Sequence, residues 1–233
     1  MANFDLSFEK MLKLEFSSSK NALHKNATET GLTFMGIYET ANPSWSGWAK
    51  IKSYLNMYNY YHYIDYLKTA ENEVKRVQNS NKNQVLKNQI ISELEPMIKE
   101  KKALCAEILE QVSQICFNDD DLKECVKDFY KKAYWDIAKL DLVLPFDTAN
   151  LIFCFGVNVG MKKAIKYAQQ VVKVENDGIV GKITLKALNS YSPLRFNKEY
   201  KELFLIYYKQ LANGNPAKYG RYLQGWINRV KNT

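Results

Sequence analysis

Apolar residues along this chain recur mainly at helical spacing, beginning near the amino terminus. The first stripe falls at positions i, i+3, i+4 and i+7 and comprises Phe8, Met11, Leu12 and Glu15. Because residues with these spacings share one face of a helix, the pattern predicts a helix over residues 7–16 that Asp5 or Ser7 can cap. One carboxylate therefore stands in an otherwise apolar helix face.

The next segment lacks helical spacing. Residues 17–33 are polar and irregular, whereas residues 33–38 carry apolar side chains suited to a short strand or an extended segment. Residues 42–44, Asn-Pro-Ser, indicate a turn, after which a second helix begins near Trp45 and Trp48. We therefore expect at most a small β-hairpin in an otherwise helical chain.

The middle of the chain carries a heptad-like apolar seam. Its members alternate spacings of three and four and include one lysine: Ile91, Leu94, Ile98, Lys101, Cys105, Ile108, Val112 and Ile115. A polar break at residues 79–83 indicates a hairpin turn, and Pro96 is expected to kink the second helix or mark its restart. We predict that residues 61–120 form an antiparallel helical hairpin that projects from the main body as an insertion.

The carboxyl-terminal half is also predicted to be helical. The expected helices span residues 120–144, 147–173 with an interruption around Gly156 to Gly160, 183–188, 196–211 and 216–230. Asp177-Gly178 indicates a tight turn, because glycine tolerates the positive φ that such turns need. Only ten glycines and five prolines occur in 233 residues, which also favours long helices over a many-stranded fold. The predicted fold class is mainly α.

The chain is basic, with 33 Lys and Arg against 25 Asp and Glu, a formal charge of +8 and a pI near 9.1. A positive surface attracts polyanions such as nucleic acid, acidic lipid or an anionic cell wall. The sequence contains no Gly-rich phosphate loop, zinc-finger spacing or Lys/Arg block. Charge alone therefore indicates solvated helix faces, and nucleic acid is not an expected partner.

No signal peptide or transmembrane segment is expected. Residues 1–16 alternate charged and apolar residues, and the long apolar run at 151–159 is shorter than the roughly 18–20 residues that a membrane span needs. We therefore expect synthesis in the cytoplasm. The cysteines contain no CxxC pair, which favours reduced, structural thiols at Cys105, Cys116, Cys125 and Cys154.

Glu15 is the strongest candidate for chemistry. It lies in the apolar stripe near the carboxyl end of its predicted helix, where loss of hydration and the helix dipole both favour the protonated carboxyl group. Such a group can donate a proton to a departing glycosidic oxygen at neutral pH. The alternative is a glutamate that pairs with a neighbouring lysine or extends into solvent.

Two blocks of sequence carry a family resemblance. The first joins the helix that ends at Leu14-Glu15-Phe16 to a polar loop and a T-x-x-G-I segment at Thr33 to Ile37. The second comprises, in order, Tyr134-Trp135, Leu144-Pro145, V-N-x-G at Val157 to Gly160, D-G-x-x-G-x-x-T at Asp177 to Thr184, and Gly225 to Val230. In these blocks the chain resembles glycoside hydrolase family 108, the muramidases common among phage endolysins. The matching blocks cover about residues 5–48 and 126–231.

The resemblance implies both an organisation and a role for Glu15. Residues 1–60 and 121–233 would form a lysozyme-like muramidase domain, with a peptidoglycan-binding-like helical part at 159–233 and the insertion at 61–120. Glu15 matches the family's catalytic glutamate. The chain departs from the family where Phe-Ser-Ser follows this glutamate in place of Gly-Gly-Tyr, and it lacks the family's Asp-Pro-Gly-Gly loop.

The polar loop supplies candidates for a second catalytic group. Phage-type lysozymes carry an acidic residue nine positions after the glutamate and a threonine six further on, and this chain has His24 and Thr30 there. His24 could orient water or act as a base, or it could simply contact the backbone. Glu29 could activate water if it lay roughly 6.5–9.5 Å from Glu15, or it could remain an exposed loop acid.

Further candidates would bind substrate. Asn26 and Thr33 could hydrogen-bond water or an acetamido group, with turn and capping roles as the alternatives. Aromatic rings can stack on sugar rings, although core packing is their commoner role, and the candidates are Tyr38, Trp45 and Trp48. Asn158 could line the groove or tie its loop together by hydrogen bonds.

We therefore predict hydrolysis of the β-1,4 bond between N-acetylmuramic acid and N-acetylglucosamine, with peptidoglycan as the partner and no metal or organic cofactor. An enzyme without an export signal would need a holin or a secretion apparatus to reach the periplasm or cell wall, and residues 61–120 could bind a protein partner. Two alternatives stay open: a lytic transglycosylase, which needs no second carboxylate, and a non-catalytic wall-binding or assembly protein.

Overall fold

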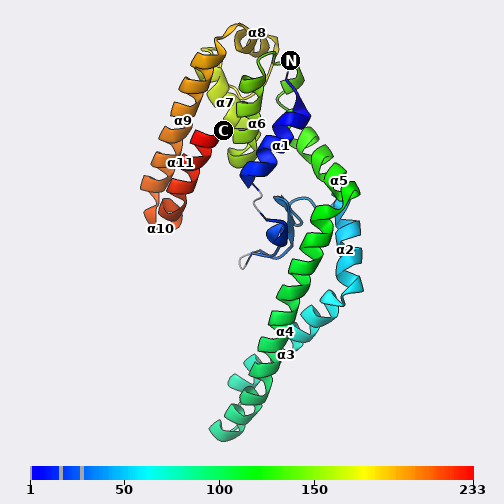
Figure 1. Ribbon diagram of the computed structural model, residues 1–233. Helices are drawn as coiled ribbons and strands as arrows, with labels where there is room; N and C mark the ends of the chain where they lie inside the picture. The colour runs from blue at the N-terminus through cyan, green and yellow to red at the C-terminus, as the bar shows by residue number, and fades with distance from the viewer. Residues whose placement is uncertain (1, 16–17, 27–28) are drawn as a thin grey trace. The chain divides into compact units, whose positions relative to one another are not determined.

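The computed structural model describes residues 2–15, 18–26 and 29–233, which are mainly helical, as predicted (Figure 1). The α-helices are α1 Phe4–Glu15, α2 Gly47–Met57, α3 Tyr60–Gln78, α4 Gln84–Asn118, α5 Asp120–Tyr130, α6 Phe146–Val159, α7 Met161–Val171, α8 Lys182–Ser190, α9 Pro193–Gly214, α10 Pro216–Tyr219 and α11 Leu223–Asn232. Shorter helical turns are η1 Ser19–Asn21, η2 Lys131–Trp135, η3 Leu140–Leu142 and η4 Gly220–Tyr222. Within these described ranges, no helix combines the length and apolar character that crossing a membrane requires.

Contacts divide the chain into two compact units. The terminal unit comprises residues 1–15 and 127–233, and the hairpin unit comprises residues 16–126. The described residues from 18 to 60 thus pack with the helical hairpin that follows them. The predicted division into a muramidase domain and an insertion follows sequence resemblance instead of contacts, and it stays a prediction.

Helix α1 begins earlier than its apolar stripe predicted. Asn3 provides the cap, because its Oδ1 accepts a hydrogen bond from the backbone N–H of Leu6 at 3.1 Å. The two predicted caps lie inside the helix instead, Asp5 exposed and Ser7 fully buried. Of the predicted stripe, Phe8 and Met11 are buried and Leu12 is half-buried.

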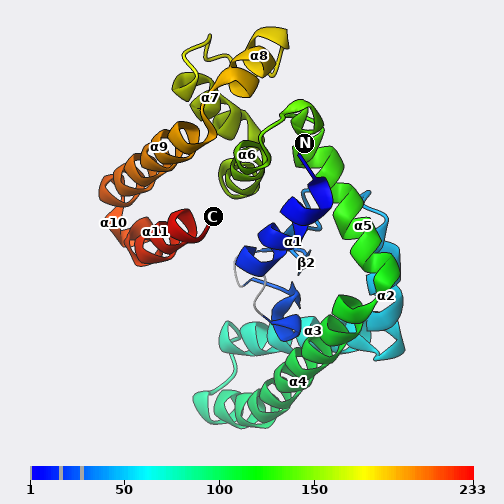
Figure 2. The same cartoon turned by 45° about the horizontal axis from the view of Figure 1, so that its top comes forward.

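The core of the terminal unit surrounds α6, in which every residue from Thr148 to Gly156 is buried. Phe155 stacks on Phe204 of α9, with ring centroids 3.9 Å apart. Helices α6 and α7 are separate, as the predicted interruption requires, and Gly160 joins them with a φ of +89°. Helices α9 and α11 lie side by side in both views (Figures 1 and 2).

The single helix predicted over residues 120–144 is wrong. Helix α5 continues into the π-helical turn η2, and the chain then turns back at Lys139, which has a φ of +50°. Trp135 supplies the physical reason: its ring is fully buried, and its Nε1–H donates to Oδ1 of Asp141 at 2.8 Å. A straight helix would carry Asp141 away from this indole.

The hairpin unit contains the predicted antiparallel pair, α3 and α4, which lie side by side in both views (Figures 1 and 2). The turn between them matches the predicted polar break. Helix α4 continues through Pro96 without the restart that was one of the two expectations. Its seam is fully buried at Cys105, Ile108 and Val112 and half-buried at Ile91, Leu94 and Ile98.

A small antiparallel sheet precedes these helices. Its strands, β1 Leu23–His24, β2 Thr33–Phe34 and β3 Ile37–Tyr38, are ordered β1-β2-β3. The predicted hairpin is β2–β3; its two-residue turn places Met35 at φ +45° and Gly36 at φ +78°, as a tight hairpin turn requires. Ser113 of α4 anchors β1, because its Oγ accepts from the N–H of Leu23 at 2.8 Å.

All four cysteines are free thiols, as expected from their spacing. Cys105, Cys116 and Cys154 are buried and Cys125 is half-buried. Burial raises the pKa of the Cys116 thiol to about 12, so this group stays protonated at neutral pH. These cysteines are structural apolar residues in the described chain.

Candidate functional site

Glu15 is the last residue of α1, and its side chain lies outside the described residues. Its predicted role as an acid therefore stays a prediction. The residues before it are described: Lys10, Lys13 and Leu14 line a surface pocket of about 230 Å³ in the terminal unit. Asn150 of the buried helix α6 lies at the same pocket.

The predicted loop residues form two small hydrogen-bonded pairs in the hairpin unit. Thr33 is buried, and its hydroxyl donates to Oε2 of Glu29 at 3.1 Å. Thr30 and Tyr38 form the second pair, in which the Tyr38 hydroxyl accepts from the Thr30 N–H at 3.3 Å. Hydrogen bonds from the hydroxyls of Thr30 and Thr40 lower the pKa of Tyr38. The loop thus fixes the orientation of Glu29 and of the Tyr38 ring.

His24 contacts the backbone. Its ring Nδ1 lies 3.0 Å from the carbonyl oxygen of Asn21, and since a carbonyl can only accept, Nδ1 carries the proton. This contact is the structural alternative to a catalytic role that the sequence left open. Asn26 is exposed in the same loop.

The two tryptophans that were predicted to bind sugar, Trp45 and Trp48, both donate hydrogen bonds to backbone carbonyl oxygens. Trp48 is only 3% exposed, and its Nε1–H donates to the carbonyl oxygen of Asn42 at 2.9 Å. Trp45 is half-buried, and its Nε1–H donates to the carbonyl oxygen of Cys125 at 3.2 Å. In this structure the Trp48 ring offers no face to a sugar, whereas Trp45 keeps part of its ring accessible.

Asn158 belongs to the terminal unit, near the end of α6. Its Oδ1 accepts from the hydroxyl of Tyr208 on α9 at 2.5 Å. The bond ties the end of one helix to another, in line with the structural alternative that the sequence left open.

The hairpin unit contains a surface pocket of about 440 Å³ that we call the lysine pocket. Of the predicted site residues whose side chains the structure describes, Thr30 alone lines it. The other charged or aromatic side chains around it include Lys25, Glu39, Lys52, Tyr60, Tyr61 and Lys68. The pocket therefore combines several cations with one carboxylate and aromatic walls.

Glu39 is held in its ionised form in this pocket. Partial burial would raise its pKa, but hydrogen bonds from Lys52 and from the backbone N–H of Leu32 outweigh that effect and lower the pKa overall. The two bonds are 2.7 Å from Lys52 Nζ and 3.1 Å from the Leu32 nitrogen, one to each carboxylate oxygen. The negative charge of Glu39 is therefore already compensated.

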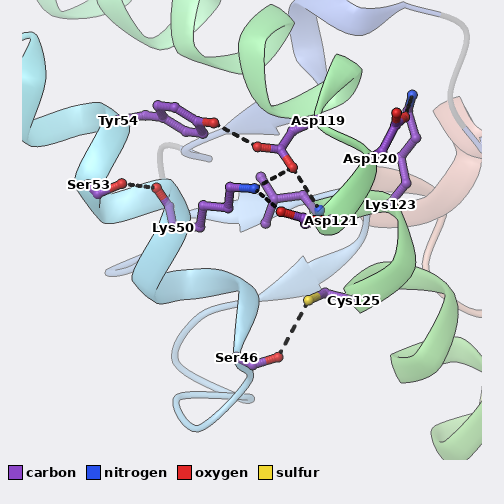
Figure 3. A network of polar contacts seen from close by, with 10 residues as sticks. Ser46, Lys50, Ser53, Tyr54, Asp119, Asp120, Asp121, Lys123 and Cys125 are labelled. Carbon is purple, nitrogen blue, oxygen red and sulfur yellow. Dashed lines mark hydrogen bonds and ion pairs between the residues drawn. The ribbon is translucent and has the colours of Figure 1, made fainter.

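A second charged network links α2 to the junction of α4 and α5 (Figure 3). Asp119 is almost buried and accepts hydrogen bonds from Lys50 Nζ and the Tyr54 hydroxyl, each at 2.7 Å. It also caps α5 by accepting from the N–H of Leu122 at 3.0 Å. Burial would raise the pKa of Asp119, but these bonds lower it to about 2. This network serves the fold, since its donors and acceptors are paired with each other.

The motif at Asp177 to Thr184 closes on Gln169 of α7. The side-chain N–H groups of Gln169 lie 2.7 Å from Oδ1 of Asp177 and 3.0 Å from the carbonyl oxygen of Ile179. Its side-chain oxygen accepts from the N–H of Gly178 at 2.8 Å. Gly178 has a φ of +81°, as the predicted tight turn requires. The motif thus has a structural role: Gln169 holds the turn at residues 177–179 against helix α7.

Sequence reasoning missed the lysine pocket. Its cations come from three separate segments, the loop at Lys25, helix α2 at Lys52 and helix α3 at Lys68. One signal was available: Tyr61, Ile64 and Lys68 stand at i, i+3 and i+7, so they share one face of α3. That spacing predicts a common face but not what the face packs against.

Comparison with known proteins bears on the carboxyl-terminal segment. Residues 163–231 match the model of a family described as "Predicted Peptidoglycan domain". They overlap the part predicted to be peptidoglycan-binding-like and include the motif around Gln169. The match supports a peptidoglycan-associated role for this segment, whereas membership of glycoside hydrolase family 108 stays a prediction.

The chain as a whole is similar to a solved structure from Brucella abortus, entitled "Structure of Brucella abortus SagA". The two are 17% identical over 98% of this chain and 89% of that chain, with a TM-score of 0.54. At this identity the likeness shows a shared fold. No curated protein matches the chain.

Proposed function

We propose that this protein is a peptidoglycan hydrolase that cleaves the β-1,4 bond between N-acetylmuramic acid and N-acetylglucosamine, with Glu15 as general acid. The observation that carries the proposal is the match of residues 163–231 to a peptidoglycan domain. It gives a substrate to the same chain whose first helix ends on a glutamate in register with an apolar stripe. Breaking a glycosidic bond needs such a carboxylic acid.

The position of Glu15 supports its proposed role. It closes α1, where the negative end of the helix dipole opposes ionisation of a carboxyl group. It also stands four residues after the buried Met11 and seven after the buried Phe8. In the proposed reaction Glu15 gives its proton to the glycosidic oxygen as the bond to the sugar breaks.

Glu29 is the carboxylate that we propose activates the attacking water. The hydroxyl of the buried Thr33 holds one of its oxygens, which leaves the other able to accept a proton from water. His24 is the other candidate in the loop, and its Nδ1 is bound to the backbone. A hydrolase needs this second group, whereas a lytic transglycosylase does not.

The decisive test replaces Glu15 with glutamine. Glu15→Gln is expected to lower the clearing rate of outer-membrane-stripped cells by at least about 100-fold, since general acid catalysis contributes roughly 10²–10⁴-fold. Glu9→Gln is the matched control, because Glu9 is exposed on the same helix and should retain full activity. Equal clearing by the wild type and Glu15→Gln would refute the proposed role of Glu15.

Product analysis separates the two enzymatic readings. Mass spectrometry of the digest should detect muropeptides with reducing ends, and Glu29→Gln should lower their yield strongly. Products with 1,6-anhydro ends that persist in Glu29→Gln would identify a transglycosylase instead.

A non-catalytic wall-binding protein is the second candidate. It is favoured by the fact that the family match covers the carboxyl-terminal segment and supports association with peptidoglycan. On this reading the wild type, Glu15→Gln and Glu29→Gln would all pellet with purified walls, and none would release soluble fragments.

A further inference from the structure

The lysine pocket has a charge that its internal contacts do not neutralise. Three lysines line it against one glutamate, and that glutamate is paired with Lys52. Lys68 forms an ion pair with Asp65 at 3.0 Å, but both side chains are about two-thirds or more exposed, so water screens this pair. Lys25, the third of these lysines, is exposed. The pocket therefore favours an anionic ligand.

The pocket also has an apolar wall. Tyr61 and Ile64 present one face of α3 to it, and both are half-buried. Burial raises the pKa of Tyr61, so its ring remains neutral at physiological pH. A ligand that combines a carboxylate with short aliphatic groups would satisfy the lysines and this wall together.

The size of the pocket limits the ligand. A cavity of about 440 Å³ lies toward the small end of ligand sites and accommodates a few amino-acid residues. A nucleic-acid duplex or a flat membrane needs an extended basic surface instead. The pocket is also open on one side, since its lysines are exposed, which allows a ligand attached to a polymer to enter.

These features match one part of peptidoglycan. Its glycan consists of acetamido sugars whose lactyl carboxyl group is joined to the stem peptide by an amide bond, whereas the stem peptides carry free carboxylates and small aliphatic side chains. We propose that the lysine pocket binds a stem peptide, with Lys25 and Lys68 contacting a carboxylate and Tyr61 and Ile64 contacting its aliphatic groups. The proposal deepens the proposed function and rests on it for the choice of polymer.

The proposal assigns a role to the first helix of the hairpin. Tyr61, Ile64 and Lys68 all belong to the segment predicted as an insertion, and Lys25 and Thr30 belong to the polar loop. The hairpin would thus complete a subsite for substrate and need not serve solely as an arm for a protein partner. It would let the protein distinguish peptide-bearing from bare glycan.

The test measures binding in the Glu15→Gln protein, so that the ligand is not consumed. Isothermal titration would compare a disaccharide that carries its stem peptide with the same disaccharide whose lactyl carboxyl group is capped as a methylamide, so that neither ligand has a free lactyl carboxylate. We expect the peptide-bearing ligand to bind at least about 10-fold more tightly. Lys25→Ala with Lys68→Ala should abolish this difference, while Lys52 is left in place to hold Glu39.

The matched control removes two other lysines. Lys75→Ala with Lys99→Ala makes the same change in charge on exposed positions of the same hairpin, away from the pocket, and should keep the preference. Circular dichroism and thermal unfolding would establish that both double variants fold. The proposal is overturned if the pocket variant keeps its preference, or if the two ligands bind equally to the parent.

The outcome is separable from that of the proposed function. Clearing of cells by the wild type together with equal binding of both ligands would leave the hydrolase standing and remove the stem-peptide subsite. Preferential binding without any clearing would retain the subsite in a wall-binding protein. If a single-stranded oligonucleotide at physiological salt bound more tightly than the peptide-bearing disaccharide and lost affinity in the pocket variant alone, the pocket would be reassigned to nucleic acid.

Discussion

Each unit of the molecule contains a polar network that fixes a turn between helices, and the two networks use different chemistry. In the carboxyl-terminal segment, the neutral side chain of Gln169 is buried and satisfies groups on the turn around Gly178. In the hairpin unit, the ionised side chain of Asp119 gathers Lys50 and Tyr54 at the start of α5 (Figure 3). One network is centred on a neutral side chain and the other on a charged one.

The difference predicts different responses to pH. The amide of Gln169 does not titrate, so its bonds to the backbone of Gly178 and Ile179 do not depend on pH. Its bond to the Asp177 carboxylate lowers the pKa of that group and weakens only when the carboxylate is protonated in acid. Asp119 has a pKa lowered from 3.8 to about 2, so its contribution depends on remaining ionised. The segment that matches a peptidoglycan domain is thus the one whose central side chain carries no charge of its own.

Removing the neutral hub should have the largest effect on stability. Gln169→Leu leaves the N–H of Gly178 and the carbonyl of Ile179 without their partners in a buried setting, which should cost about 3 kcal/mol of unfolding free energy. The loss should be the same at pH 7 and pH 5, where Asp177 stays ionised, as measured by urea unfolding. Gln170→Leu, on the exposed neighbour, should change stability little. Similar unfolding free energies for Gln169→Leu and Gln170→Leu would show that the hydrogen bonds of Gln169 do not stabilise the fold.

Removing the charged hub should have a smaller and pH-dependent effect. Asp119→Asn should lower the unfolding free energy by about 1–2 kcal/mol at pH 7. Because the folded pKa is depressed, the stabilisation is complete above about pH 4 and disappears as pH falls through about 2. Urea unfolding at several pH values should therefore find the wild type converging on the variant in acid. A constant gap down to pH 2 would contradict the assignment.

Much of the helical layout could be predicted because it depends on local spacing. The seam of α4 continues through Cys105 and Val112 into the core, and the polar break before α4 became its turn. Pro96 shows the limit of local rules, since it removes one backbone donor but does not end a helix that packs along α3. The cap of α1 shows another limit. Asn3 and Ser7 are both capping residue types, and burial decides between them.

The candidate site was less predictable for a physical reason. The register of Glu15 in its helix follows from spacing within one element. The lysine pocket instead needs a loop, α2 and α3 to meet, and no local pattern encodes that packing. The aromatic candidates illustrate the same point. The Trp48 ring could stack on a sugar by its chemistry, but it is buried in the core and is not accessible.

In the network around Gln169, the backbone conformation of the turn can be tested separately from the hydrogen bonds of Gln169. Gly178→Ala forces an L-residue to a φ of +81° and puts a methyl group 2.9 Å from Cγ of Lys162, which should cost about 1–2 kcal/mol. Gly181→Ala is the control in the same motif, because its added Cβ meets nothing within 4 Å. Hydrogen exchange of residues 177–184 should rise in the first variant and stay unchanged in the second. Equal exchange would mean that the turn tolerates strain.

The smallest expected effect comes from Asp121, the exposed carboxylate of the charged network, as compared with the buried Asp119. Asp121 also pairs with Lys50 at 2.7 Å, but its side chain is 86% exposed, whereas that of Asp119 is 8% exposed. Exposed pairs are screened by water, so Asp121→Asn should shift the melting temperature by about 1 °C or less, and added salt should erase even that shift. Thermal unfolding in low and high salt measures both effects. A loss as large as that of Asp119→Asn would mean that Lys50 needs both carboxylates, and that the network is held by total charge instead of by one buried acceptor.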